Sequence, residues 1–152
     1  MHAQNPDSIL VVCGDGKLRP QAEEKACSLG IASAVRFLGQ ISDVQDVYQS
    51  LDLFVLPSLY EGLGMVAIEA QASGLPCICS ERVPNDVALS SRCSFLPLSM
   101  GVEGWSNAIL AARRDVFDRS DPHSSPGFES YDIFKAAPKL EEYYLKLFET
   151  VN

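Results

Sequence analysis

The chain has 152 residues, of which 47% are hydrophobic and 21% are charged. This composition fits one globular domain with a buried core and excludes a disordered chain. Lys and Arg number 12 and Asp and Glu number 20, so the formal net charge is −8, which argues against a nucleic-acid partner because phosphate binding needs a basic surface.

The first third of the chain begins with a predicted strand and a predicted helix. Residues 8–13 (SILVVC) are apolar throughout, which predicts a strand buried on both faces. Gly14-Asp15-Gly16 ends this strand. A helix is predicted from 20 to 29, and Gly30 then stands where a glycine commonly stops a helix.

Two further strands are predicted at 35–38 (VRFL) and 51–56 (LDLFVL). Between them, Ser42-Asp43-Val44-Gln45 has the pattern of a capping box, in which Ser and Gln side chains bond reciprocally to the backbone. It predicts a short helix that ends near Ser50.

Alternation of helix and strand continues to residue 114. A helix is predicted at 65–73, followed by the stop signals Gly74 and Pro76. Composition and periodicity further predict strands at 77–79 and 95–98 and a helix at 103–114.

The end of the chain has a different character. Residues 115–130 are polar and predict a linker. Asp132 is suited to cap a last helix at 132–150, which Pro138 is expected to kink or restart. Apolar side chains recur at helical spacing along it, at Leu140, Tyr143, Tyr144 and Leu147.

Short units of strand and helix predict parallel pairing with right-handed crossovers. The predicted fold class is therefore α/β, a doubly wound parallel sheet with helices on both faces, formed by residues 1–152 as a single domain. In such a sheet, ligands bind beyond the carboxyl ends of the strands, so the loops after the strands are the candidate sites.

The cysteines and the first residues of the chain indicate the cellular compartment in which the protein is expected. The five cysteines form no C-x-x-C pair and are odd in number, which disfavours a zinc site and a disulfide scaffold. The first residues do not combine a basic segment with an apolar one, as a secretory signal would. We therefore expect a cytoplasmic domain.

The loop Gly14-Asp15-Gly16 is the first candidate site. Glycines there permit close approach of the backbone to a ligand, and the next helix start favours a phosphate. Position 19 is Arg, so the dinucleotide fingerprint G-x-G-x-x-G is incomplete. A simple tight turn after a strand explains the same residues.

The second candidate runs from Glu61 to Glu69. Glycines on either side of Leu63 allow a tight turn that presents free amides at a helix start, where an anionic diphosphate binds well. Glu69 stands in a stretch apolar enough to pack on the sheet, where a carboxylate needs a partner such as the two hydroxyls of a ribose. Alternatively, both glutamates simply favour the positive end of a helix.

Several segments of the sequence together resemble those of a known family. Residues 61–69 (EGLGMVAIE) have the E-x7-E spacing of the retaining glycosyltransferases of family 4, also called group 1. The flanking segments 52–58 (DLFVLPS) and 69–76 (EAQASGLP) are similar too. Residues 11–16 (VVCGDG) and 35–40 (VRFLGQ) resemble two other strand-turn signatures of the family, in the expected order. The tail at 131–144 resembles the subgroup that builds capsular or extracellular polysaccharide.

The resemblance implies one half of a GT-B enzyme, in which two Rossmann-like domains face a cleft. The chain resembles the C-terminal domain, which binds a nucleotide-diphospho-sugar such as a UDP- or GDP-sugar. In the family, the N-terminal domain holds a glycan or lipid-linked acceptor. No cofactor and no metal are implied, because a helix dipole and basic side chains stabilise the diphosphate leaving group. The full-length enzyme is expected in the cytoplasm, including the inner face of the membrane.

The resemblance also assigns roles. Glu61 contacts hydroxyls of the donor sugar and is the catalytic candidate, whereas Glu69 holds the ribose. Backbone amides from Leu63 to Val66 meet the sugar and the phosphates. The donor-binding candidates are Gly14, Gly16, Gln40, Ile41, Glu61, Gly62, Leu63, Gly64, Met65, Val66 and Glu69.

Two features of the family have no match in this sequence. They are an earlier strand with an Arg and a Lys that grip the diphosphate, and the acceptor domain with its catalytic His. We therefore expect a domain that lacks its first strand, is inactive alone and self-associates through an exposed apolar edge. Lys17 and Arg19 are candidates for the phosphate grip, although flexible surface cations are usually solvated.

Two other functions are alternatives for this sequence. A non-catalytic nucleotide-binding or interaction module could keep the same fold. A nicotinamide-dinucleotide domain would need a third glycine in the first loop and an acidic residue after the second strand, where this chain has Gly39-Gln40. The sequence therefore disfavours the dinucleotide domain.

Overall fold

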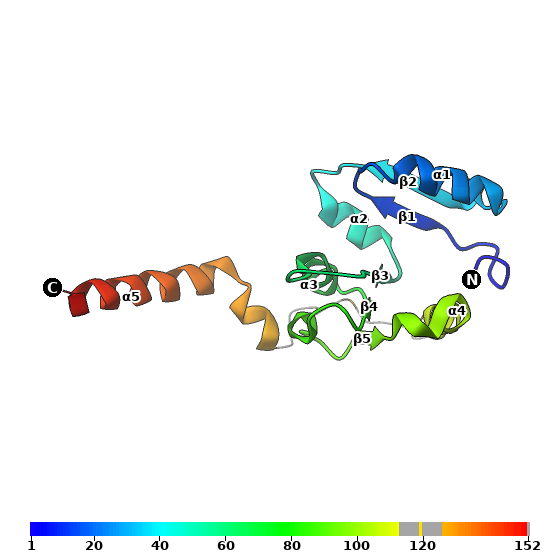
Figure 1. Ribbon diagram of the computed structural model, residues 1–152. Helices are drawn as coiled ribbons and strands as arrows, with labels where there is room; N and C mark the ends of the chain where they lie inside the picture. Colours follow the sequence, from blue (N-terminus) through cyan, green and yellow to red (C-terminus); the bar gives the residue numbers. More distant parts are fainter. Residues whose placement is uncertain (113–118, 120–125, 152) are drawn as a thin grey trace.

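The computed structural model describes residues 1–112, 119 and 126–151 (Figure 1). Parallel strands form two sheets in this part of the chain. In one, β1 (Leu10–Cys13) pairs with β2 (Val35–Gly39). In the other, β4 (Cys77–Ser80) lies between β3 (Phe54–Leu56) and β5 (Cys93–Leu96).

Helices connect the strands as predicted. The α-helices are α1 (Arg19–Ser28), α2 (Val44–Ser50), α3 (Met65–Ala72), α4 (Gly101–Ala112) and α5 (Ile133–Val151). Short 3-10 helices lie at η1 (Ala32–Ala34), η2 (Asn85–Val87), η3 (Leu98–Met100) and η4 (Pro126–Ser130). The α/β class with parallel pairing is confirmed, and most predicted elements differ from the observed ones only at their ends.

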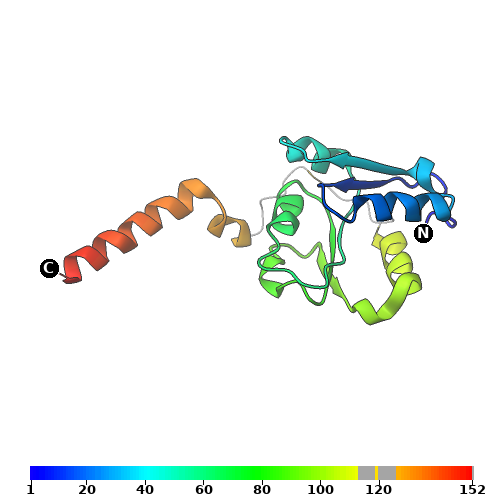
Figure 2. The same ribbon diagram turned by 45° about the horizontal axis from the view of Figure 1, so that its top comes forward.

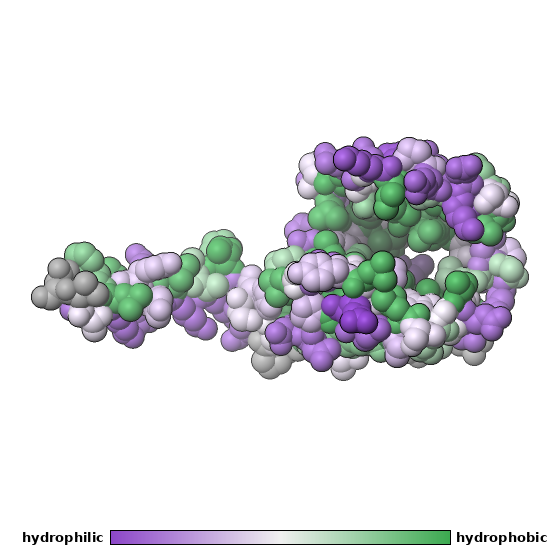
Figure 3. Space-filling model, viewed as in Figure 1, coloured by the Kyte–Doolittle hydropathy of each residue, from purple (hydrophilic) through white to green (hydrophobic). Residues whose placement is uncertain are grey.

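The predicted single sheet is divided in two. Within the described residues, β1 pairs only with β2, and β3 pairs only with β4, so each has one unpaired edge. A hollow separates the part that holds β1 and β2 from the part that holds β3 to β5 (Figure 3). The expectation of one continuous sheet is therefore wrong for the described residues, because no strand bridges these two edges.

Burial of the strands also differs from expectation. The prediction that residues 8–13 are buried on both faces is wrong, since Ile9 is 58% exposed and Leu10 is 54% exposed. The strand that is buried at every residue is β4, which has a neighbour on each side. Within the described residues, β1 has a neighbouring strand on one edge only, so it has fewer neighbouring strands than β4.

Helix ends follow local signals. Gly30 adopts φ +69° after α1, and its amide and that of Ile31 donate to the carbonyls of Cys27 and Ala26, which is a Schellman motif. Asp132 caps α5 by accepting a hydrogen bond of 3.0 Å from the Phe134 amide.

The predicted capping box at the start of α2 does not form. The N-cap residue is Asp43 and makes no side-chain cap. Ser42 instead donates its hydroxyl to the Asp43 carboxylate at 3.3 Å. The helix begins one residue later than the box requires, so Gln45 is out of register with it.

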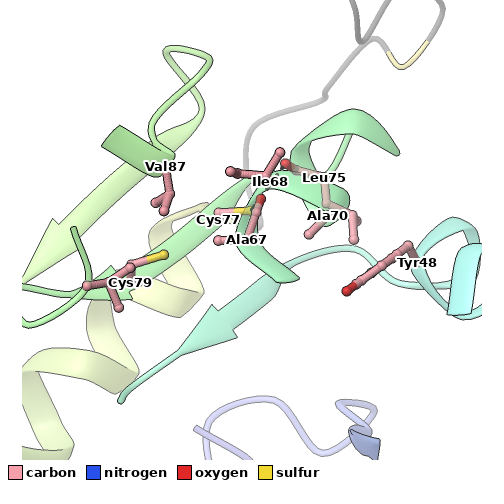
Figure 4. Close-up of a cluster of buried hydrophobic side chains, with 9 residues drawn as sticks. Tyr48, Ala67, Ile68, Ala70, Leu75, Cys77, Cys79 and Val87 are labelled. Atoms are coloured by element: carbon pink, nitrogen blue, oxygen red, sulfur yellow. Dashed lines mark hydrogen bonds between the residues drawn. The ribbon is translucent and has the colours of Figure 1, made fainter. Parts of the chain in front are cut away.

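The core lies between α3, β4 and the loop that follows β4. It contains Tyr48, Ala67, Ile68, Ala70, Leu75, Cys77, Cys79, Val83 and Val87, most of which are drawn in Figure 4. Tyr48 reaches toward α3 from one side of this cluster, and Val87 lies on the other side (Figure 4). The core thus supports α3, the helix that carries Glu69.

The C-terminal helix α5 extends away from the rest of the chain in both views (Figures 1 and 2). It continues through Pro138 instead of restarting there, and its predicted apolar face is exposed. Most of the predicted linker lies outside the described residues, and its last part forms η4, where Phe128 is buried. Within the described residues, no helix is both long and apolar enough to cross a membrane.

Candidate functional site

The predicted site residues fall into two groups, one on each sheet. The first group follows β1 and β2. Gly14 has φ +109°, a conformation that disfavours any side chain, and its amide donates to the Gly39 carbonyl at 2.6 Å. This contact brings the first loop beside Gln40 and Ile41, which are exposed directly after Gly39. Two loops that are distant in sequence therefore form one surface at the strand ends.

The two cations that follow the first loop have different environments. Lys17 is exposed. Arg19 donates a hydrogen bond of 2.8 Å to Glu23 and lies over the Phe37 ring at 5.9 Å. The hydrogen bond to Glu23 raises the pKa of Arg19 above its ordinary value. Because Arg19 is already paired, its contacts do not support the phosphate grip considered for it.

The second group is the segment from Glu61 to Glu69 at the start of α3. Glu61 is half-buried and accepts a hydrogen bond of 3.2 Å from the Ser58 hydroxyl. The Ser58 carbonyl in turn accepts from Ser80 at the end of β4. These bonds attach the Glu61 loop to the most buried strand of the sheet.

Gly64 is the N-cap of α3, with φ +76°, and no side chain caps the helix. Amides in the first turn of a helix have no intrahelical acceptor, so this end offers donors to a ligand. Gly62, Leu63, Met65 and Val66 around it are all exposed. The predicted donor surface is therefore accessible.

Glu69 lies on the exposed side of α3, not packed on the sheet, so the expected cost of burying its carboxylate does not arise. This expectation was wrong because the core-facing positions of the helix are Ala67, Ile68, Ala70 and Gln71. Glu69 nevertheless has a defined partner, since its Oε2 accepts a hydrogen bond of 3.1 Å from the Tyr48 hydroxyl.

Two cavities of about 430 Å³ each meet at Glu69. One lies between α2 and α3, where Tyr48 and Glu69 are part of its wall. The other lies between α3 and the start of the C-terminal segment, and the positively charged Lys135 is part of its lining. Lys135 pairs with Glu129 at 2.9 Å, and this contact lowers the pKa of Glu129.

Sequence reasoning missed Tyr48. Its side chain is 4% exposed, and burial, followed by the charge and the hydrogen bond of Glu69, raises its pKa well above the ordinary value. The available signal was the single aromatic residue of the helix 44–50 (VQDVYQS). Its contact with Glu69 spans 21 residues of sequence, so no local pattern indicates it.

Metal ligands do not gather in the described part of the chain. No group of three or more His, Cys, Asp or Glu side chains there is arranged to hold a metal ion. The residues that the structure brings together around α3 are instead carboxylates, backbone amides and apolar side chains, a set suited to hydroxyl and phosphate groups.

Comparison with known proteins identifies relatives among glycosyltransferases. A glycosyltransferase of Bacillus subtilis (strain 168) named EpsF is 43% identical over 109 residues, which cover 68% of this chain and 28% of the relative. The Escherichia coli UDP-Gal:alpha-D-GlcNAc-diphosphoundecaprenol alpha-1,3-galactosyltransferase is 27% identical over 146 residues, 93% of this chain and 38% of the relative. The chain thus spans well under half the length of these relatives.

Fold and family comparisons agree with this. Sucrose-phosphate synthase from Thermosynechococcus elongatus has a similar fold, with a TM-score of 0.75 and 24% identity over 97% of this chain and 40% of that one. The family model described as glycosyl transferases group 1 matches residues 1–89, which include both loops of the candidate site. This chain belongs to the group 1 family of glycosyl transferases.

Proposed function

We propose that the chain is the donor-binding domain of a retaining glycosyltransferase. In this proposal, it holds a nucleotide-diphospho-sugar while the sugar passes to a growing polysaccharide or a lipid-linked acceptor, in capsule or exopolysaccharide biosynthesis. The name of the Escherichia coli relative, with a UDP-sugar donor and a lipid diphosphate acceptor, is in keeping with this. The acceptor would be held by a separate N-terminal domain, without which the chain is inactive.

One observation carries the proposal: the segment from Glu61 to Glu69 presents an uncapped helix start between two carboxylates, with Glu69 on a cavity wall. The amides of Leu63 to Val66 are suited to the diphosphate and to the sugar. Glu69 would accept from the ribose hydroxyls, and Glu61 would contact the hydroxyls of the donor sugar. Gly14, Gly16, Gln40 and Ile41 would border the phosphates and the base.

In this role the protein's chemical contribution is orientation and charge stabilisation. The bond between the sugar and the diphosphate breaks as the acceptor hydroxyl oxygen bonds to the sugar. The diphosphate leaves with the bonding electrons, and an oxygen of the departing diphosphate takes the proton that the acceptor hydroxyl loses. Helix-start amides stabilise the negative charge on that leaving group, and no metal is needed in this proposal.

The sheet topology supports a missing first strand. In the doubly wound order 3-2-1-4-5-6, the first strand lies between the second and the fourth. If β1 to β5 are strands two to six, removal of the first strand leaves the order β2-β1 and β3-β4-β5, which is the observed division. A strand that contributes Arg and Lys to the diphosphate would enter between β1 and β3.

We also propose that the open edges make the isolated chain self-associate. Unpaired strand edges bind other chains, and exposed apolar side chains lie at the start of β1, at Leu10 and at Ile9 directly before it. Light scattering after size exclusion is expected to give a mass above 16.6 kDa, which falls with dilution. A constant mass of one chain at all concentrations contradicts this proposal.

Calorimetric titration of the chain with UDP, GDP and ADP tests the proposed function. We expect one nucleotide to bind and Glu69→Ala to weaken it by about tenfold or more, because hydrogen bonds to a charged group contribute about 1.5–3 kcal/mol. Glu24→Ala, which removes an exposed carboxylate from α1, is the matched control and is expected to leave binding unchanged.

Either of two outcomes overturns the donor-site proposal. Equal affinity of Glu69→Ala and the unchanged chain removes Glu69 from the site. No binding of any of the three nucleotides by the unchanged chain favours the alternative function, a non-catalytic interaction module with the same fold.

A further inference from the structure

The Tyr48 hydroxyl is a buried donor aimed at the one carboxylate that lies on both cavities. It lies 3.1 Å from Glu69 Oε2 and 3.3 Å from the Val66 carbonyl oxygen. A backbone carbonyl and an ionised carboxylate have no proton to donate. The Tyr48 hydroxyl is therefore the donor in this arrangement. The hydrogen bond between these two side chains therefore runs from Tyr48 to Glu69.

Tyr48 itself is held firmly. Its side chain is 4% exposed and belongs to the core cluster (Figure 4). Its ring meets Phe54 edge-on, with centroids 5.9 Å apart and planes at 77°. Because burial raises the pKa of the phenol, Tyr48 keeps its proton throughout the neutral range and remains a donor.

In contrast to Tyr48, Glu69 is not held in place by burial. It lies on the exposed side of α3, where a glutamate has several rotamers. The hydrogen bond from Tyr48 engages Oε2, whereas Oε1 has no partner among the described residues. An oxygen that is held in place but unpaired is suited to accept from a hydroxyl of a ligand, because less rotamer freedom is lost on binding.

We propose that Tyr48 is a positioning residue for Glu69, and that its hydroxyl holds the carboxylate ready for the vicinal hydroxyls of a ribose. This rests on the proposed function, in which Glu69 binds the ribose of the donor nucleotide. Tyr48 lines the cavity between α2 and α3 together with Glu69, so the two side chains share one wall of the site.

The test compares the nucleotide that binds best among UDP, GDP and ADP with its 2′,3′-dideoxy analogue. Tyr48→Phe removes the hydroxyl and keeps the ring in the core. We expect it to weaken binding of the ribonucleotide by about tenfold, which is near the lower end of the range for one hydrogen bond to a charged group, and to leave binding of the dideoxy analogue unchanged. In the Glu69→Ala background, the same substitution is expected to have no further effect.

Tyr143→Phe, at an exposed position of α5, is the matched control and is expected to change neither affinity. Thermal unfolding monitored by circular dichroism establishes that each variant is folded. A structural role of Tyr48 alone would weaken the ribonucleotide and its dideoxy analogue equally, and that result overturns the proposal.

Failure of this inference is distinguishable from failure of the proposed function. If Glu69→Ala weakens the ribonucleotide and Tyr48→Phe does not, only the role of Tyr48 is wrong. If the unchanged chain binds none of the three nucleotides, the donor site and the role of Tyr48 are both refuted.

Discussion

Gly64→Ala is expected to lower the free energy of unfolding by about 3 kcal/mol. Gly64 has φ +76°, which costs an L-residue about 1–2 kcal/mol. A Cβ at this position would also lie 3.2 Å from a methyl group of Val83 and of Val87. Both valines are buried, so little space is open to them, and we expect overpacking to add about 1–3 kcal/mol. Urea unfolding followed by circular dichroism measures the change.

Two other glycines separate these effects. Gly30 has φ +69° but open space around its Cβ position, so Gly30→Ala isolates the backbone cost at about 1 kcal/mol. Gly62 has neither a positive φ nor a close neighbour, so Gly62→Ala is expected to be nearly neutral. If Gly64→Ala costs no more than Gly30→Ala, the tight packing of Gly64 against the two valines is contradicted.

Gln71→Leu is expected to destabilise the chain by about 2–3 kcal/mol. Gln71 is 2% exposed and links α3 to the loop after β4. Its amide nitrogen donates to the Val87 carbonyl at 2.7 Å, and its oxygen accepts from the amide and the hydroxyl of Ser90 at 3.2 and 3.0 Å. Leucine is similar in volume but leaves the Ser90 amide without this acceptor, and an unsatisfied polar group is costly.

Ser90→Ala is the control for this link. It removes the hydroxyl and keeps the hydrogen bond from the Ser90 amide to Gln71, so its expected cost is about 1 kcal/mol. Chemical unfolding of both variants measures the difference. Equal costs for Gln71→Leu and Ser90→Ala would show that the amide hydrogen bond does not stabilise the loop.

The positions of helices and strands were largely predictable from the sequence. Gly30 and Asp132 were correctly predicted to end and to start helices, because the backbone geometry at helix ends depends on a few adjacent residues. The predicted capping box at Ser42 was wrong. A capping box requires an exact spacing, and the N-cap of α2 is one residue later, at Asp43. The motif from Glu61 to Glu69 is on a loop and helix start, as predicted.

Burial and pairing between distant segments were less predictable. Apolar composition indicated a fully buried first strand, yet burial depends on the elements that pack around a strand, and β1 has only β2 beside it in its sheet among the described residues. Similarly, the apolar stretch around Glu69 indicated a buried carboxylate, whereas the orientation of α3 directs Glu69 outward. In both cases composition was correct about local structure but carried no information on which face is covered.

For this protein, local patterns along the chain were sufficient for the α/β class, the order of its elements and the segment that carries the site. The hydrogen bond between Tyr48 and Glu69, the link from Gln71 to Ser90 and the division into two sheets depend on which segments distant in sequence lie side by side. The physical reason is that helix caps and strand periodicity involve residues a few positions apart, whereas these contacts join segments about twenty residues apart that meet only once the core has formed.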